Sequence, residues 1–219
     1  MGDPNHTRWS SAKKIQKLNE AQERFVIDTR CLVDTATDNL VDGTAEYSLP
    51  TDVLDLNRVA INDGTAWIEL QRKSMFYLDF YSSSGHSADT GTPSAYYVDL
   101  DPDNKKLHLY PIPGSGDAGT ANLKFEYVKI PAALSSDSST PFGGHTLLSP
   151  YHMAVAYEAA RQILLQDPGV KMNPQEAGYV QGNMEREYSR LVSSCVDKFR
   201  AMGEEKPLRW VGGRYYRGR

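Results

Sequence analysis

The pattern of apolar positions predicts a helix close to the start of the sequence. Between residues 10 and 33, positions at alternating spacings of three and four form one narrow stripe: Ile15, Leu18, Gln22, Phe25, Thr29 and Leu32. This spacing places side chains on one face of a helix, and Ser10 or Ser11 can cap its start. The stripe ends near residues 34–39, whose Asp, Thr and Asn side chains favour caps and turns over helix continuation.

The period of the pattern then changes from 3.6 to 2, which predicts strands between about residues 44 and 130. A first strand alternates around Tyr47 and stops at Pro50. Asp63-Gly64 separates two alternating runs, as in a hairpin, and a second hairpin is expected to turn at residues 101–104. About five or six strands are enough for a small barrel or sandwich.

Helical spacing returns in the last third of the chain, at residues 149–166 and 174–202. Ser149 and Asn173 can cap these two helices, and a proline follows each cap at the first helical position, where it is favoured. The face expected to be buried in the first of them consists of Met153, Ala156, Tyr157, Ala160 and Leu164. The second carries a longer stripe: Ala177, Val180, Met184, Tyr188, Leu191, Cys195, Phe199 and Met202.

These elements predict an α+β fold, in which an antiparallel β module is inserted into a bundle of one N-terminal and two C-terminal helices. No single helix can bury its own apolar stripe, so the helices must pack together, with the β module at one end. We therefore expect a helical core at residues 8–40 and 145–203, a β-rich insert at residues 44–132, and an extended C-terminal tail at residues 204–219.

Composition indicates a soluble protein that is made and kept in the cytoplasm of its host cell. Hydrophobic residues are 40% and charged residues 24% of the chain, which are ordinary values for a globular protein. No apolar run approaches the ~18 residues that a membrane helix needs, and the N-terminus has no apolar signal core. Cys31 and Cys195 lie far apart in helix-like stretches, so we expect buried reduced thiols.

Three patterns suggest ligand sites, but each lacks features that such a site needs. Residues 114–119, GSGDAG, match the glycine spacing of a dinucleotide site, but a strand follows instead of a helix, so a hairpin loop is expected. Asp99, Asp101 and Asp103 resemble the start of a calcium loop without its glycine and its final glutamate. The five histidines share no metal-ligand spacing. Because no catalytic motif occurs either, we expect no cofactor, no metal and no enzymatic activity.

The C-terminal tail differs from the rest of the chain in charge. Residues 206–219 contain five basic and no acidic residues. Because the whole chain has a net charge of −4, the other 205 residues have a net charge of −9. Arginine, tryptophan and tyrosine dominate binding hot spots, and the tail collects them: Arg209, Trp210, Arg214, Tyr215, Tyr216, Arg217 and Arg219. We expect these residues to dock on a partner protein. The alternatives are stacking on nucleic acid and a disordered, solubilising end.

An ordered set of short motifs lies between Leu18 and Val59. A first helix ends in a CL…TAT segment, and a G-x-x-x-Y-x-L-P strand and an acidic-apolar run follow it. The residues concerned are Cys31, Leu32, Thr35, Ala36, Thr37, Gly43, Tyr47, Leu49, Pro50 and Asp52. Later come Tyr96-Tyr97, the LHLYPIP run at residues 107–113 and the helix at residues 151–165. In this order, over about residues 15–168, the sequence resembles head-to-tail adaptor (connector) proteins of tailed bacteriophages and prophages.

The resemblance implies a structural subunit of the virion neck, assembled in the host cytoplasm. Such proteins form a ring, usually of twelve copies (a dodecamer), that lies under the portal and extends the DNA channel toward the tail. The implied partners are the portal protein, tail or neck proteins and further copies of the chain. The resemblance also implies that double-stranded DNA passes through the ring without specific binding. An acidic or neutral body suits such passage, because it does not hold the phosphates. The basic tail then anchors to the portal or to a neighbouring subunit.

Two other classes of function are alternatives. One is a tail or baseplate module that recognises a ligand through its β insert, with residues 82–93 as the recognition loop. The other is an enzyme whose site is assembled from residues far apart in the sequence. The oligomeric state separates the adaptor from the binding module, because an adaptor forms a closed ring and a binding module need not.

Overall fold

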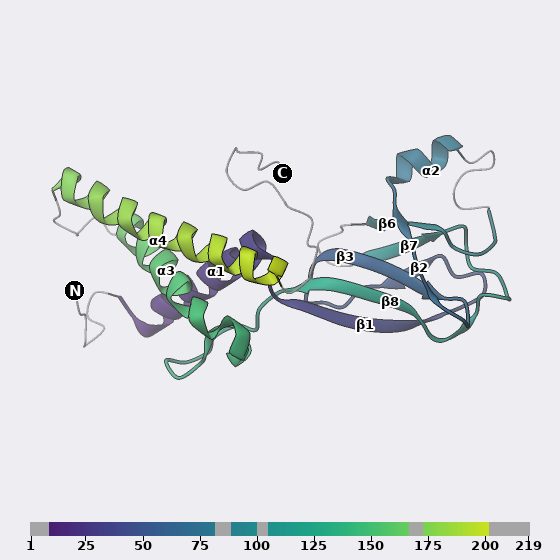
Figure 1. Cartoon of the computed structure of the whole chain (residues 1–219), viewed down its shortest axis with the longest axis horizontal. Coiled ribbons are helices and arrows are strands. Elements are labelled where there is room, and N and C mark those ends of the chain that lie inside the picture. Colours follow the sequence, from purple (N-terminus) through teal and green to yellow (C-terminus); the bar gives the residue numbers. More distant parts are fainter. Residues whose placement is uncertain (1–8, 82–88, 100–104, 167–172, 202–219) are drawn as a thin grey trace. The chain divides into compact units, whose positions relative to one another are not determined.

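The structure is a computed structural model that describes residues 9–81, 89–99, 105–166 and 173–201. The chain divides into two compact units, one of helices and one built mainly of strands. The helical unit contains Met1–Leu32 and Ile130–Arg219, and the β unit contains Val33–Lys129. Figure 1 shows the N-terminal helix beside the two C-terminal helices, although the whole β unit separates them in the sequence. The predicted α+β fold is confirmed.

Helix α1 (Ser11–Thr29) begins where the sequence predicts and ends four residues earlier than predicted. The side-chain oxygen of Ser10 accepts a hydrogen bond from the backbone N–H of Lys13 at 3.3 Å, which caps the helix. At the other end Arg30 adopts the left-handed conformation, with a φ of 53°, and donates its backbone N–H to the carbonyl of Val26. This conformation directs the chain out of the helix.

The expectation that residues 34–39 form caps and turns is wrong, because Val33–Leu40 is strand β1. β1 pairs antiparallel with β8 (Gly119–Lys129) along almost its whole length. Asp and Asn favour turns where no neighbouring strand offers backbone partners, and here β8 offers them to the whole segment. The helical core therefore ends before residue 33 instead of at residue 40, and the strands are not confined to residues 44–130.

Two four-stranded sheets build the β unit (Figure 1). The first sheet has the order β1-β8-β3-β4, in which β3 is Val53–Asn62 and β4 is Trp67–Glu69. The second has the order β2-β7-β6-β5, with these strands in turn: Glu46–Ser48, Lys106–Tyr110, Ala95–Asp99 and Gln71–Arg72. Among these described strands, β5 and β6 pair parallel and the other neighbours pair antiparallel.

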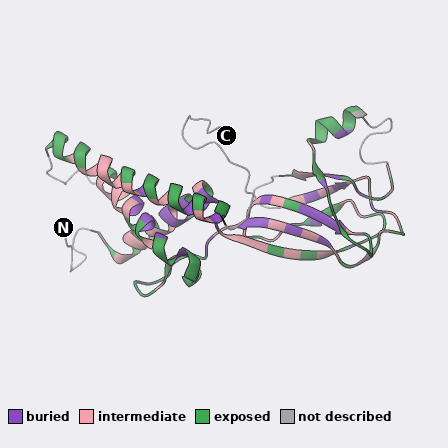
Figure 2. Cartoon of the chain, viewed as in Figure 1, coloured by how far each residue is buried: buried purple, intermediate pink, exposed green. Residues whose placement is uncertain are grey.

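One hydrophobic core joins the two sheets. Val59 and Ile61 on β3 and Phe125 on β8 belong to the same buried cluster as Leu107 and Leu109 on β7. Figure 2 shows buried positions alternating with more exposed ones along the first sheet. The predicted period of two is thus confirmed, and the two facing sheets form the sandwich that the sequence allows.

The predicted hairpin at Asn62-Asp63-Gly64 is confirmed between β3 and β4. The carboxylate of Asp63 accepts backbone hydrogen bonds from Ala66 and Thr65, both at 2.8 Å. These two bonds hold the pKa of Asp63 below its ordinary value. Gly64 follows with a φ of +91°, a conformation in which a Cβ atom is strained.

Gly64→Ala is therefore expected to lower the free energy of unfolding by about 1–2 kcal/mol. The matched control is Gly116→Ala, because Gly116 also has open space around its Cα but does not have a positive φ. That control is expected to leave stability unchanged or to raise it by up to about 1 kcal/mol. Urea unfolding of both variants is the measurement. Equal destabilisation by the two changes would contradict the backbone argument.

The glycine pattern at residues 114–119 is not a hairpin loop, so that prediction is wrong. β7 ends at Tyr110 in the second sheet, whereas β8 begins at Gly119 in the first, and residues 111–118 cross from one sheet to the other. A strand follows the glycines, as expected. The other predicted turn, at residues 101–104, lies outside the described residues, but the strands that flank it pair antiparallel.

Helix α3 (His152–Gln166) begins three residues later than predicted, because a 3-10 segment at Thr146–Tyr151 precedes it and contains Pro150. Another 3-10 segment, Pro141–Gly144, lies upstream. The expected buried face is wrong: Met153 is 55% exposed, and the buried residues are Ala154, Val155, Glu158 and Ala159. An alanine-rich helix is apolar on more than one face, and hydrophobic spacing alone could not select a face that includes a glutamate.

Helix α4 (Pro174–Ala201) carries the predicted stripe, and Asn173 caps it by accepting the backbone N–H of Gln175 at 2.8 Å. The stripe is buried unevenly. Its C-terminal half is covered at Tyr188, Cys195 and Phe199, whereas the N-terminal half is only half-buried at Ala177, Val180 and Met184. Met202, the last predicted position, lies outside the described residues.

An aromatic cluster forms the centre of the helical unit, where α1 meets α3 and α4. Phe25 is fully buried, and its ring centroid lies 5.3 Å from that of Phe142, 6.0 Å from that of Tyr151 and 6.3 Å from that of Tyr188. Both cysteines are buried and form no disulfide, as predicted. Cys31, however, follows α1 instead of lying within a helix.

Candidate protein-interaction surfaces

The residues that the sequence assigns to partner binding all lie outside the described residues. They are Arg209, Trp210, Arg214, Tyr215, Tyr216, Arg217 and Arg219. Their docking on a partner stays a prediction that rests on composition. The described residues carry two further surfaces, both on the β unit, which the sequence analysis did not identify.

The first surface lies on α2 (Met75–Tyr81), a short helix of the β unit that follows β5. Phe76 and Phe80 are 79% and 72% exposed, which is unusual for phenylalanine. They are four residues apart, so both project from one side of the helix, where their rings stack with centroids 6.5 Å apart. Buried Leu78 anchors the helix. We call Phe76 and Phe80 the phenylalanine pair.

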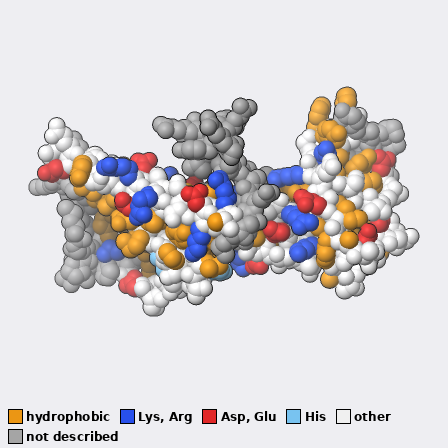
Figure 3. All heavy atoms as spheres, in the orientation of Figure 1, with side chains coloured by type: hydrophobic (Ala, Val, Ile, Leu, Met, Phe, Trp, Pro, Cys, Tyr) orange, Lys and Arg blue, Asp and Glu red, His pale blue; other side chains and the backbone are white. Residues whose placement is uncertain are grey.

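The phenylalanine pair has apolar and polar neighbours, and the apolar ones include the exposed side chains of Met75 and Tyr77. The side-chain oxygen of Ser74 accepts the backbone N–H of Tyr77 at 3.2 Å at the start of α2. The ammonium group of Lys73 lies 4.6 Å from the centre of the Tyr77 ring. Asp79 is exposed and shares the side of the helix that carries the pair, since it is three residues beyond Phe76. Figure 3 shows the hydrophobic side chains gathered over α2, at the upper right.

One signal in the sequence could have identified α2. The run MFYLDFY at residues 75–81 is apolar except for one aspartate, and it follows a serine that can cap a helix. Such a run has neither the alternation of a half-buried strand nor the length of an ordinary amphipathic helix. The strand period on both sides of it concealed the helix.

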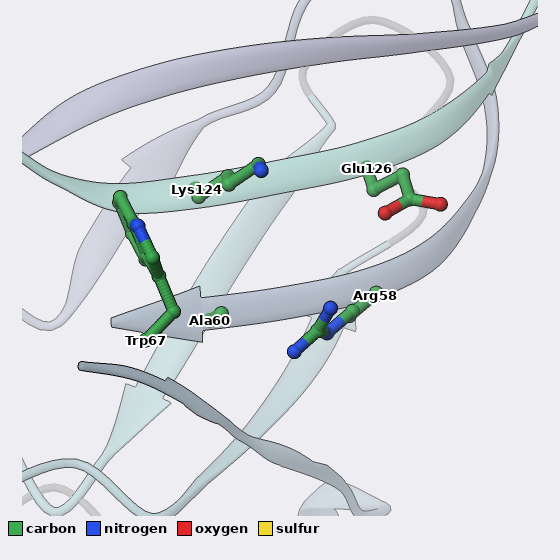
Figure 4. A pocket seen from close by; sticks show the side chains of 5 residues that line it. All are labelled: Arg58, Ala60, Trp67, Lys124 and Glu126. Carbon is green, nitrogen blue, oxygen red and sulfur yellow. The ribbon is translucent and has the colours of Figure 1, made fainter. Parts of the chain in front are cut away.

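The second surface is a pocket of about 90 Å³ on the outer face of the first sheet (Figure 4). Five side chains from three neighbouring strands line it: Arg58, Ala60, Trp67, Lys124 and Glu126. Ala60 alternates with the core residues Val59 and Ile61, so it belongs to the outer face, yet its large neighbours cover it almost completely. The small methyl group among longer side chains creates the hollow. We call it the Trp67 pocket.

The Trp67 pocket combines an indole ring with charged groups. The ammonium group of Lys124 lies 5.7 Å from the centre of the Trp67 ring. The guanidinium of Arg58 forms an exposed ion pair with Glu69 at 3.0 Å, of a kind that contributes little to stability. Small-molecule sites usually measure about 300–1,000 Å³. The Trp67 pocket is smaller, so it matches a single inserted side chain better than a ligand.

The most deeply buried charged group among the described residues of the helical unit, the carboxylate of Glu158, is paired with cations. Glu158 on α3 is 1% exposed, and its carboxylate accepts bonds from Arg24 at 2.7 Å, Arg161 at 2.9 Å and Gln162 at 3.1 Å. Burial acts to raise the pKa of Glu158, but the bonds from Arg161 and Gln162 and the charges of Arg24 and Arg161 outweigh it. The pKa therefore lies below its ordinary value.

A second, partly buried pair supports the same helices. The hydroxyl of Tyr188 on α4 donates to the carboxylate of Asp28 on α1 at 2.7 Å, and the guanidinium of Arg24 lies 5.5 Å from the centre of the Tyr188 ring. Burial, with the nearby charge of Asp28, raises the pKa of Tyr188 strongly. The network thus joins all three helices through side-chain contacts inside the unit. Such pairing indicates a structural role.

Two chemical properties can be stated for the part of the chain that the structure describes. Within it, no cluster of three or more His, Cys, Asp or Glu side chains is arranged to hold a metal ion. None of the described helices is both long and apolar enough to cross a membrane. On the β unit, the exposure of the phenylalanine pair and the mixed walls of the Trp67 pocket suit contact with protein.

Comparison with known proteins agrees with a role in assembly. A family model described as SU10 adaptor protein matches residues 1–202, which include every described residue of both units. A comparison with curated proteins finds no match. The family match ends at residue 202, before the C-terminal tail begins, so it says nothing about the tail's role. The sequence resemblance to head-to-tail adaptors predicts this family. Because the match covers most of the chain, this protein belongs to the SU10 adaptor protein family of phage structural proteins.

Proposed function

We propose that this phage adaptor protein forms a closed ring, of twelve copies, between the portal and the tail. Membership of the adaptor family supports an adaptor role in the virion and contact with other head or tail proteins. The ring, its copy number and its place at the neck are our proposal. The central opening would continue the DNA channel from the portal toward the tail.

The observation that carries the proposal is exposed apolar surface on both units. In the helical unit, the N-terminal half of the α4 stripe is only half-buried, and Tyr179 and Leu165 are exposed. In the β unit, the phenylalanine pair projects from α2. Large apolar patches on a protein surface commonly mark interaction sites. A ring needs two different patches on each copy, because each neighbour is contacted through a different surface.

Charge supports the passage of DNA through the ring. The 205 residues outside the basic segment carry a net charge of −9. Protein groups that bind DNA tightly do so by neutralising phosphates with lysine and arginine. An acidic body does not hold the duplex in this way, so DNA would slide past without specific binding.

The mass of the assembled neck tests the ring. The purified protein is mixed with its cognate portal protein, and the complex is measured by native mass spectrometry and imaged by negative stain. We expect many copies of the adaptor on each portal, stacked as a ring with an opening wide enough for duplex DNA. A monomer in the absence of portal does not bear on the proposal, but a single copy per portal would contradict it.

We further propose that residues 203–219 dock on the portal or on an adjacent subunit. Gly203 and Pro207 disfavour continuation of the α4 helix, and no periodic apolar face follows them. Three large aromatic side chains nevertheless remain, and leaving each of them in water would forfeit roughly 2 kcal/mol of burial. Trp210, Tyr215 and Tyr216 would serve as anchors and the arginines as polar clamps.

Deletion of residues 207–219 tests the tail. We expect the truncated protein to keep its melting temperature and to lose attachment to portal-bearing capsids. A matched control keeps the tail's length and charge but replaces Trp210, Tyr215 and Tyr216 by serine, and it should also fail to attach. Attachment at full strength after truncation would contradict docking. Loss of folding would instead assign the tail to the subunit's own core.

A further inference from the structure

We infer that the phenylalanine pair of one copy docks on the Trp67 pocket of the neighbouring copy, with one of the two rings entering the pocket. The inference rests on the proposed ring and specifies a contact that would join adjacent subunits. It follows from three observations: the size of the pocket, the chemistry of its walls, and the placement of the two surfaces on different sheets.

The size of the pocket favours an inserted side chain over a small-molecule ligand. Its volume of about 90 Å³ is well below the about 300–1,000 Å³ of small-molecule sites. The pocket opens to solvent, so a planar ring can enter it edge-first while its stem stays at the rim. Among the large apolar side chains of the described residues, Phe76 and Phe80 are the most exposed. A second copy of the chain therefore already carries a suitable occupant.

The walls of the pocket suit an aromatic ring. Trp67 offers the face of an indole, on which a phenyl ring can pack edge-to-face or offset. The cationic groups of Lys124 and Arg58 lie on the walls, and a cation attracts the electron-rich face of a ring. Asp79 is exposed and lies three residues beyond Phe76 on α2, close enough to the phenylalanine pair that docking would bring its carboxylate toward the two cations. Glu126, the remaining charged residue of the lining, lies opposite Arg58 on the neighbouring strand.

The occupant does not come from the same copy, since none of the residues that line the pocket belongs to α2. Helix α2 follows β5 in the second sheet, whereas the pocket lies on the outer face of the first sheet, beyond the core (Figure 1). Buried Leu78 fixes α2 in its place. Moving the phenylalanine pair to its own pocket would pull Leu78 out of the β unit. A contact between two different patches on two copies is the head-to-tail type, which closes into a ring when the rotation allows.

The surface area that the contact would bury is too small for two copies to associate through it alone. Two phenylalanine side chains bury about 300–500 Å² together, which is less than the ~1,000 Å² that an independent interface needs. The contact would therefore hold only where the portal and other surfaces already bring the copies together. This sets the condition for the test, which must be made on the portal-bound protein.

Cross-linking between two variants that each carry one added cysteine tests the contact. Phe76→Cys copies and Lys124→Cys copies are assembled on portal, separately and as an equal mixture, and treated with a short bis-maleimide linker. We expect a covalent dimer in the mixture and little or none with either variant alone, because the contact joins position 76 of one copy to position 124 of the next. The wild-type chain is the control for the native cysteines, which are both buried.

The outcomes separate this inference from the ring itself. A dimer confined to the mixture supports the contact. If the mass of the portal complex shows a full ring but the mixture gives no dimer, the contact is wrong and the ring stands. A cross-link from position 76 to the portal would also overturn the contact, since α2 would then face a different protein. If no ring forms, the proposed function fails and the contact with it.

Discussion

Replacing Phe25 by alanine is expected to lower the free energy of unfolding of the helical unit by about 3–5 kcal/mol. Phe25 is fully buried at the point where α1 meets α3 and α4, and three aromatic rings surround it within 5.3–6.3 Å. Removing the ring leaves a cavity that these rigid neighbours fill poorly. Urea unfolding, followed by the helical signal in circular dichroism, measures the loss.

Phe76→Ala is the matched control for this prediction. It removes the same ring, but from a position that is 79% exposed, so little burial is lost in the isolated subunit and the change in stability should stay within about 0.5 kcal/mol. A similar loss from both variants would mean that the aromatic cluster does not hold the helical unit together. If Phe76→Ala keeps its stability, the phenylalanine pair is not needed for folding, which the cross-linking test requires.

Elements with strong local signals were predictable from the sequence. Ser10 and Asn173 cap their helices because a side-chain oxygen next to a helix start can accept a backbone N–H whatever the rest of the fold does. The Asp63-Gly64 turn follows from the φ that only glycine adopts without strain. The alternation around Phe125 set which side chains enter the β core. Each of these features depends on a few neighbouring residues.

Elements decided by distant partners were not predictable. The polar segment at residues 34–39 is a strand only because β8 lies beside it, about ninety residues later in the chain. The buried face of α3 includes Glu158, which a hydrophobic pattern rejects and which is buried because Arg24 and Arg161 neutralise it. Residues 111–118 cross between sheets since β7 and β8 pair with other strands. In all three cases tertiary pairing overrides local preference.

The candidate interaction surfaces illustrate the same division. The basic tail stands out in the sequence through composition alone, and its residues lie outside the described part of the chain. The Trp67 pocket could not be foreseen, because it requires that Ala60, Trp67 and Lys124 come together from three strands whose pairing only the fold determines. The phenylalanine pair lies between these cases: its residues form one visible run, but their exposure depends on Leu78 being the anchor.

Replacing Glu158 by alanine is expected to destabilise the helical unit by about 3 kcal/mol or more. Its carboxylate is almost fully buried and accepts charged hydrogen bonds from α1 and α3, so its removal leaves the partly buried guanidinium of Arg161 without its partner. Glu187→Ala is the matched control. Glu187 pairs with Arg190 at the same spacing and the same 2.9 Å, but on the surface, where such a pair contributes less than about 1 kcal/mol.

The dependence of stability on pH tests whether the charge of Glu158, and not its packing, stabilises the helical unit. Its pKa in the folded protein lies below the ordinary value of 4.5, so folding favours the ionised form. The charge therefore contributes its full stability above pH 4.5, and this contribution is lost as the pH falls through the lower folded pKa. The stability gap between the wild type and Glu158→Gln, which keeps the shape but not the charge, should be constant near neutral pH and narrow in acid. A gap that stays the same down to the acid limit of folding would show that packing, and not the charge, makes Glu158 important.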